Sequence, residues 1–159
     1  DADNFLRITD RKKDLIKTAG GKYVAPQGIE NHLKLQPHIE QACVIGDRRP
    51  YCVALVVPDL LALEEWAEAQ GLRSTDPRDL LSDERVRKLI EKQVSEVNKG
   101  LGNWESIKYF HIVPDPFSQE NNLLTPTLKV RRKAVMKVYS DDIDDLYREG
   151  ERRKTGGLI

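Results

Sequence analysis

Two apolar runs separated by a short turn constrain the fold of this chain most. Residues 39–45 read Ile-Glu-Gln-Ala-Cys-Val-Ile, and residues 52–57 read Cys-Val-Ala-Leu-Val-Val. Runs of this length and composition are typical of strands, and the short link Gly46–Pro50 predicts that they pair antiparallel. Because both runs are almost continuously apolar, we expect them to form the centre of a sheet covered on at least one face.

Helical patterns and a third apolar run surround this pair. The sequence predicts helices over 27–36, from a cap at Asp59 to Gln70, from a cap at Ser82 to Gly100, over 131–139, and from a cap at Ser140 to Glu149. Residues 73–81 are predicted to form a polar loop, and Ile107–Val113 a third strand. The order of the elements lacks a strict β-α-β rhythm. We therefore expect an α+β domain, with helices packed on a small, mostly antiparallel central sheet.

Length and composition narrow the class of protein. A chain of 159 residues is expected to form one domain, here residues 1–150, with residues 151–159 as a loose tail. A charged fraction of 33% with zero net charge argues against a protein that coats nucleic acid or an anionic membrane. The two cysteines are too few for a disulfide framework, which favours the cytosol, and the three scattered histidines predict no metal site. No apolar run is long enough to span a bilayer.

A two-stranded hairpin is expected before the sheet, with Asn4–Thr9 as its first strand and residues 10–24 completing it. Gly20 and Gly21 indicate its turn, because glycine reaches positive φ without a Cβ clash. Cations at positions 11, 13, 17 and 22 lie close to that turn, an arrangement that suits contact with a phosphate or another anion. From residue types alone, a solvated charged hairpin is the favoured interpretation.

The order of residues in this stretch resembles a known motif. Adenylate-forming enzymes, which include acyl-CoA synthetases, firefly luciferase and peptide-synthetase adenylation domains, carry a similar pattern after their hinge. The matching residues are Arg11, Asp14, Ile16, Lys17, Gly20, Pro26, Ile29 and Glu30. A second stretch, residues 124–129 (Leu-Thr-Pro-Thr-Leu-Lys), resembles the terminal lysine motif of long-chain fatty acid–CoA ligases. The resemblance covers nearly the whole chain, but only the small C-terminal domain of that family. The chain lacks a starting Met, and we take it to be the end of a longer protein.

The resemblance implies a catalytic role for Lys129, which would act during adenylation; the alternative is a solvated lysine at a helix start. Most of the superfamily has Ser-Gly-Lys or Thr-Gly-Lys at this point, whereas this chain has Thr127-Leu128-Lys129. Long-chain ligases resemble this chain in that respect. The departure raises a question about the backbone shape of the loop.

Other roles implied by the resemblance fall on the N-terminal stretch. Arg11 resembles the arginine that contacts the ribose hydroxyls, and Lys13 lies at the hinge position. Lys17 and Tyr23 resemble residues that contact the adenylate, although Tyr23 could equally be a half-buried strand aromatic. The loop residues Gly20 and Gly21 would line the tunnel for the pantetheine arm of coenzyme A, or form an ordinary turn. Lys22 would meet coenzyme A phosphates, with a solvated lysine as the alternative.

The implied activity is a two-step ligation. A long-chain fatty acid and Mg-ATP give acyl-adenylate and pyrophosphate, and coenzyme A then displaces AMP. The chain would act as a lid that rotates against its own large N-terminal domain, which binds ATP and Mg²⁺, so the chain alone should be inactive. A cytoplasmic enzyme is expected, and peripheral membrane association stays open. Two alternatives remain: the lid of an aryl or medium-chain acid ligase, and a non-catalytic anion-binding module.

Overall fold

A three-stranded mixed sheet forms the centre of the computed structural model, which describes residues 15–72 and 76–156. Its strands are β3 (Ile39–Ile45), β4 (Cys52–Pro58) and β5 (Ile107–Ile112), in the order β3-β4-β5. Strands β3 and β4 pair antiparallel, with Ala42 opposite Val56, as the short turn predicts. Strand β5 pairs with β4 in parallel, because the chain returns through a long helical crossover. The α+β class is confirmed, and the sheet is mixed.

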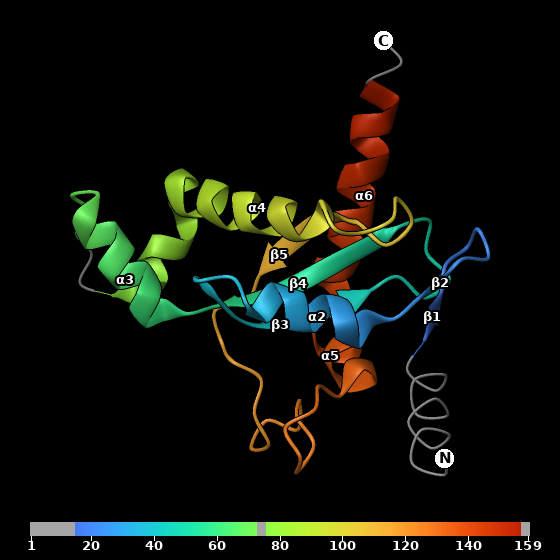
Figure 1. Ribbon diagram of the computed structural model, residues 1–159, viewed down its shortest axis with the longest axis horizontal. Coiled ribbons are helices and arrows are strands. Elements are labelled where there is room, and N and C mark those ends of the chain that lie inside the picture. The colour runs from blue at the N-terminus through green and yellow to red at the C-terminus, as the bar shows by residue number, and fades with distance from the viewer. Residues whose placement is uncertain (1–14, 73–75, 157–159) are drawn as a thin grey trace.

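Helices cover both faces of this sheet (Figure 1). Alternate residues of β4 point to opposite sides, so Ala54 and Val56 face α2 (Pro26–Lys34) and α4 (Glu84–Asn98). Val53 and Leu55 face α5 (Arg132–Val138) and α6 (Ser140–Gly156). All seven residues of β4 are buried, which explains its continuously apolar sequence.

A smaller cluster packs beside the main core. It joins α3 (Leu60–Ala69) to the short 3₁₀ helix η1 (Pro77–Ser82) and the start of α4 through Leu63, Leu80 and Val86. Asp59 caps α3 as predicted, because its carboxylate accepts a hydrogen bond from the N–H of Ala62 at 3.1 Å. Helix η1 replaces much of the polar loop expected over residues 73–81.

Two of the expected helix ends are wrong. Asp83, not Ser82, caps α4: its carboxylate accepts from the N–H of Arg85 at 2.8 Å, while the hydroxyl of Ser82 donates to the carbonyl of Asp79 and closes η1. The last helix does not end near Glu149 but continues to Gly156, and it projects beyond the body of the domain (Figure 1). Most of the expected loose tail is therefore helical. In the two described ranges, every helix falls short of the length and apolarity needed to cross a membrane.

The two-stranded N-terminal hairpin is confirmed, and both of its strands lie within residues 16–24. Strands β1 (Ile16–Lys17) and β2 (Tyr23–Val24) pair antiparallel, with Ile16 opposite Val24. Both of these residues are buried in the main core, so the hairpin packs on the domain. The first strand predicted over Asn4–Thr9 lies outside the described residues, as do Arg11 and Lys13.

Candidate active-site loops

Lys129 lies at the end of a tight turn that precedes α5. Leu124 and Val130 form a β-bridge across this turn. Within it, the N–H of Thr125 donates to the carbonyl of Lys129, and the N–H of Leu128 donates to the carbonyl of Thr125, both at 2.8 Å. The hydroxyl of Thr125 also accepts from the N–H of Lys129 at 3.1 Å. The turn is thus closed by its own backbone, and it leaves the Lys129 side chain exposed.

Leu128 occupies the position at which most of the superfamily has glycine, and its backbone conformation shows the shape of the loop. Its φ is +65°, in the left-handed region that favours glycine. The side chain is 65% exposed, so packing does not compensate for the strain of this backbone. The loop therefore has the backbone conformation that a glycine would adopt there, although a leucine occupies the position.

A buried ion pair fixes the start of α5 just after this turn. The Arg132 guanidinium donates from Nη2 to Glu30 Oε2 at 2.6 Å and from Nε to the carbonyl of Val44 at 3.0 Å. The same carboxylate oxygen accepts from the N–H of Val44 at 2.7 Å. Because β3 is an edge strand, these two side chains satisfy backbone groups that have no neighbouring strand. We call the three residues the Arg132 anchor.

Burial dominates the electrostatics of Glu30, which is 5% exposed and comes from α2. Desolvation raises the pKa of this carboxyl, while the guanidinium of Arg132 and the N–H of Val44 oppose the rise. The close contacts to both donors favour the ionised carboxylate at neutral pH. Sequence reasoning placed Glu30 in a motif but did not identify this partner, because Arg132 is one of several cations in its segment.

The glycine turn of the hairpin is closed in a similar way. The N–H of Thr18 donates to the carbonyl of Lys22, and the N–H of Gly21 donates to the carbonyl of Thr18, both at 2.9 Å. Gly21 has a φ of +83°, so the turn needs a glycine there. At Gly20 φ lies outside the left-handed region, and an added Cβ would meet nothing within 4 Å. Neither backbone conformation nor packing in the described part of the chain requires a glycine at position 20.

Exposed cations and aromatic rings lie around this turn. Tyr23 is 60% exposed, so the alternative of a half-buried strand aromatic is wrong; its neighbour Val24 points inward instead. The Lys17 ammonium lies 5.6 Å from the centre of the Tyr23 ring. The Lys22 ammonium lies 5.5 Å from the centre of the Trp104 ring, which is 47% exposed. Trp104 was missed by the sequence reasoning, because the loop that carries it lies far away along the chain.

The turn between β3 and β4 holds the hairpin in place. The N–H of Arg48 donates to the carbonyl of Lys17 at 2.8 Å, and the N–H of Ala19 donates to the carbonyl of Arg49 at 2.9 Å. The Lys17 N–H also reaches the carboxylate of Asp47 at 3.3 Å. The position of the glycine turn is therefore set by residues 47–49.

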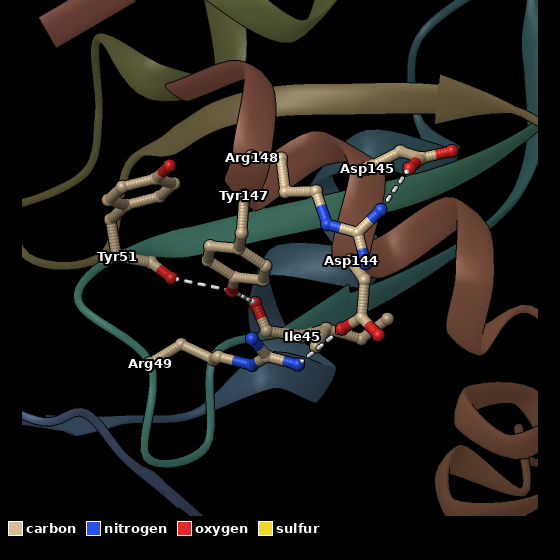
Figure 2. A network of polar contacts seen from close by, with 7 residues as sticks. All are labelled: Ile45, Arg49, Tyr51, Asp144, Asp145, Tyr147 and Arg148. Atoms are coloured by element: carbon tan, nitrogen blue, oxygen red, sulfur yellow. Dashed lines mark hydrogen bonds and ion pairs between the residues drawn. The ribbon is translucent and has the colours of Figure 1, made fainter. Parts of the chain in front are cut away.

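Side chains of helix α6 hold the β3–β4 turn against the domain (Figure 2). The Arg49 guanidinium forms a 2.8 Å ion pair with Asp144 and lies 4.6 Å from the centre of the Tyr147 ring. The Tyr147 hydroxyl donates to the carbonyl of Tyr51 at 2.8 Å. We call these four residues the Arg49 anchor.

A cleft of about 450 Å³ lies between the start of the hairpin and α5. A smaller hollow of about 230 Å³ lies beside Lys129 and α2. The cleft is lined by Leu15, Ile16, Asp47, Val130, Arg131, Arg132, Lys133, Ala134 and Met136. The structure thus gathers Lys17, Gly20, Gly21, Lys22 and Tyr23 on the hairpin and places Lys129 on a separate loop that projects from another edge of the domain (Figure 1).

The cysteines take no part in these loops. Cys43 and Cys52 are buried in β3 and β4, and desolvation raises the pKa of Cys43 to about 12 and that of Cys52 to about 11. Both are core residues, as expected, because a protonated, buried thiol is a poor nucleophile. In residues 15–72 and 76–156, no group of three or more His, Cys, Asp or Glu side chains could hold a metal ion.

Comparison with known proteins identifies the family of this chain. The family model described as the AMP-binding enzyme C-terminal domain matches residues 13–151. The chain belongs to this family. Long-chain-fatty-acid–CoA ligase FadD15 of Mycobacterium tuberculosis is 40% identical over 148 residues, which are 92% of this chain and 25% of that protein. Long-chain-fatty-acid–CoA ligase 6 of Homo sapiens is 39% identical over 146 residues, which are 89% of this chain and 21% of that protein.

Solved structures agree with this family. The adenylation domain of a carboxylate reductase from Mycobacterium chelonae superposes with a TM-score of 0.71 at 29% identity, over 87% of this chain and 20% of that one. The chain thus spans about a quarter or less of the proteins it matches. The resemblance to adenylate-forming enzymes is confirmed, and the activity of a whole protein follows as a proposal.

Proposed function

We propose that this chain is the mobile C-terminal lid of an ATP-dependent long-chain fatty acid–CoA ligase. The observation that carries the proposal is the closed turn ending at Lys129, which presents an exposed ammonium on a glycine-like backbone. The names of the relatives that match about nine-tenths of the chain supply the substrate class. The large N-terminal domain would hold the fatty acid and most of ATP and Mg²⁺.

In the first step, the fatty acid carboxylate would attack the α-phosphorus of ATP. A new P–O bond forms, and pyrophosphate leaves with the electron pair of the bond that breaks. Lys129 would lie between the carboxylate and the α-phosphate, and its charge would offset their repulsion as they approach. Lys17 and Tyr23, both on the exposed side of the hairpin, would contact the adenylate, as would Arg11 at the ribose.

In the second step, the sulfur of coenzyme A would attack the acyl carbonyl. A C–S bond forms, AMP leaves with the electrons of the C–O bond, and the thiol proton is lost. The lid would rotate about the hinge at Lys13 so that the glycine turn replaces the Lys129 loop at the reaction centre. Gly20 supports this assignment: nothing in the described fold requires a glycine there, whereas a pantetheine arm passing close to the backbone does. Lys22 would face the coenzyme A phosphates.

A second candidate is the lid of a different adenylating enzyme. The likeness to a carboxylate reductase adenylation domain favours it, because that protein shares the fold at 29% identity. The two candidates differ in substrate acid and in whether free coenzyme A accepts the acyl group. A non-catalytic anion-binding module has no such support from the relatives.

The test uses the full-length protein that contains this chain. It is given ATP, Mg²⁺ and coenzyme A with saturated acids of graded length and with an aryl acid, and acyl-CoA and AMP are measured. The proposal predicts equal amounts of both products and the highest kcat/KM with long-chain acids. Adenylation without any transfer to free coenzyme A, or a preference for the aryl acid, would support the second candidate instead.

A further inference from the structure

The Lys129 turn is attached to the domain by apolar packing of Leu123, Leu124 and Val130 and, on the polar side, by the guanidinium of Arg132. Arg132 follows Lys129 by three residues, and its side chain is only 19% exposed. It contacts α2 through Glu30 and β3 through Val44, so three elements meet at one group. The N–H of Arg131 donates to the carbonyl of Leu123 at 2.9 Å, which couples the turn to the start of α5.

Geometry restricts what can replace Arg132. Its Nε reaches a backbone carbonyl while its Nη2 reaches a carboxylate, which needs a planar group with donors at two fixed positions. A lysine keeps the charge but offers a single ammonium on a flexible stem. Arg132→Lys should therefore loosen the start of α5, and the Lys129 turn with it, while a cation still lies beside Glu30.

The glycine turn depends on a different guanidinium. Backbone groups of residues 48 and 49 bind the hairpin on one side, and the Arg49 side chain binds α6 on the other (Figure 2). The Arg49 and Asp144 side chains are 41% and 44% exposed, and ion pairs this exposed contribute little to stability. Removing the Arg49 side chain should therefore change the placement of the glycine turn more than the stability of the domain.

We propose that Arg132 and Arg49 are positioning residues for two different half-reactions. Arg132 sets the Lys129 turn for adenylation, and Arg49 sets the glycine turn for thioester formation. This inference rests on the proposed function. The hydrogen bonds and ion pairs of the two anchors share no residue. One joins α2 and α5 to β3 at Val44, and the other joins α6 to the β3–β4 turn and, through the Tyr147 hydroxyl at 3.4 Å from the Ile45 carbonyl, to the last residue of β3. Their effects should therefore separate.

The experiment measures both half-reactions of the full-length enzyme for each variant. Pyrophosphate exchange reports adenylation, and transfer from supplied acyl-adenylate to coenzyme A reports thioester formation. Arg132→Lys should lower kcat for exchange by about 10-fold, with KM for ATP and for the acid within about twofold of wild type and transfer unchanged. Arg49→Ala should lower transfer by about 10-fold and leave exchange unchanged.

Arg148 provides a matched control. It forms an exposed ion pair with Asp145 on the same helix as Asp144, and Figure 2 shows it pairing along that helix rather than with the turn. Arg148→Lys and Arg148→Ala should leave both half-reactions unchanged. If Arg132→Lys yields no folded protein, Glu30→Gln decides for that anchor, because the amide keeps one oxygen acceptor and loses the charge; it should show the same selective loss in exchange.

Two further variants separate this inference from the proposed function. Lys129→Ala should lower exchange alone, and Gly20→Val should lower transfer alone, if the lid assignment is right. If those two behave so but both half-reactions fall equally in the arginine variants, or fall as far in the Arg148 variants, the positioning roles are wrong and the proposed function stands. If Lys129→Ala and Gly20→Val show no selectivity, the proposed function fails and the positioning roles fail with it.

Discussion

Replacing Arg132 with leucine in the 159-residue chain should expose the energetic role of the buried ion pair. Glu30 would keep one hydrogen bond, from Val44, and its charge would lose its partner in a site that is 5% exposed. Breaking a buried pair by removing one partner costs about 3–5 kcal/mol. Glu30→Leu should cost less, roughly 2–3 kcal/mol, because the guanidinium it leaves is more exposed than the carboxylate.

The double variant tests whether these costs are shared. With both charges removed, the remaining cost comes from the N–H and the carbonyl of Val44, which lose their hydrogen-bond partners. Each group that stays unsatisfied costs about 1–3 kcal/mol. The sum of the losses in unfolding free energy of the two single variants should therefore exceed the loss in the double variant by about 2 kcal/mol or more. Urea denaturation followed by circular dichroism at pH 7 gives all four values.

Acidification adds an independent signature. Burial already raises the pKa of Glu30 above its ordinary value of 4.5, and Arg132 is the main group that opposes the rise. In Arg132→Leu the pKa should rise further, so the folded state binds more protons than the unfolded state above pH 4.5. The variant's loss of unfolding free energy relative to wild type should then be smaller at pH 5 than at pH 7. A cost below about 1 kcal/mol at pH 7, or a difference that does not shrink at pH 5, would refute the reasoning.

Three other predictions follow from single features. Burial lowers the pKa of His38, whose Nδ1 lies 2.7 Å from Gln93 Nε2, so the unfolded state takes up more protons and the free energy of unfolding should fall as pH drops below 6.5. A His38→Gln variant should lose this part of the pH dependence, which denaturation curves at pH 7 and 5.5 would measure. Leu128→Gly should change the free energy of unfolding by less than about 1 kcal/mol, because relief of left-handed strain offsets the greater freedom of glycine when unfolded, and full-length activity should persist. The 159-residue chain alone should unfold cooperatively in urea yet catalyse no pyrophosphate exchange, and exchange by this chain would contradict the assignment as a lid.

The sheet could be predicted only where neighbouring residues determine it. Strands β3 and β4 are adjacent in sequence and joined by a short turn, so apolar runs alone indicate their pairing. The parallel pairing of β5 depends on how a crossover of about fifty residues packs, and local periodicity does not report that. Ser82 and Asp83 are both good caps, and η1, which the sequence reasoning missed, decides between them.

The candidate site divides in the same way. The glycine turn and Lys129 are found from motifs, because their residues are contiguous. In the sequence, Arg132 and Arg49 cannot be told from solvated surface cations, because only the folded chain brings them to Glu30 and Asp144. The burial of Glu30 was invisible for the same reason, since it depends on α2, β3 and α5 meeting at one point.

The most direct measurement of the lid assignment is the pair of half-reactions in full-length Lys129→Ala, with Arg131→Ala and Lys133→Ala as neighbouring controls. A charge that acts only in the adenylation state should, when removed, slow fatty-acid-dependent pyrophosphate exchange by at least about 10²-fold. Transfer from supplied acyl-adenylate to coenzyme A should stay near the wild-type rate, and both controls should keep both rates. Wild-type exchange in Lys129→Ala, or an equal fall of both half-reactions in all three variants, would contradict the account.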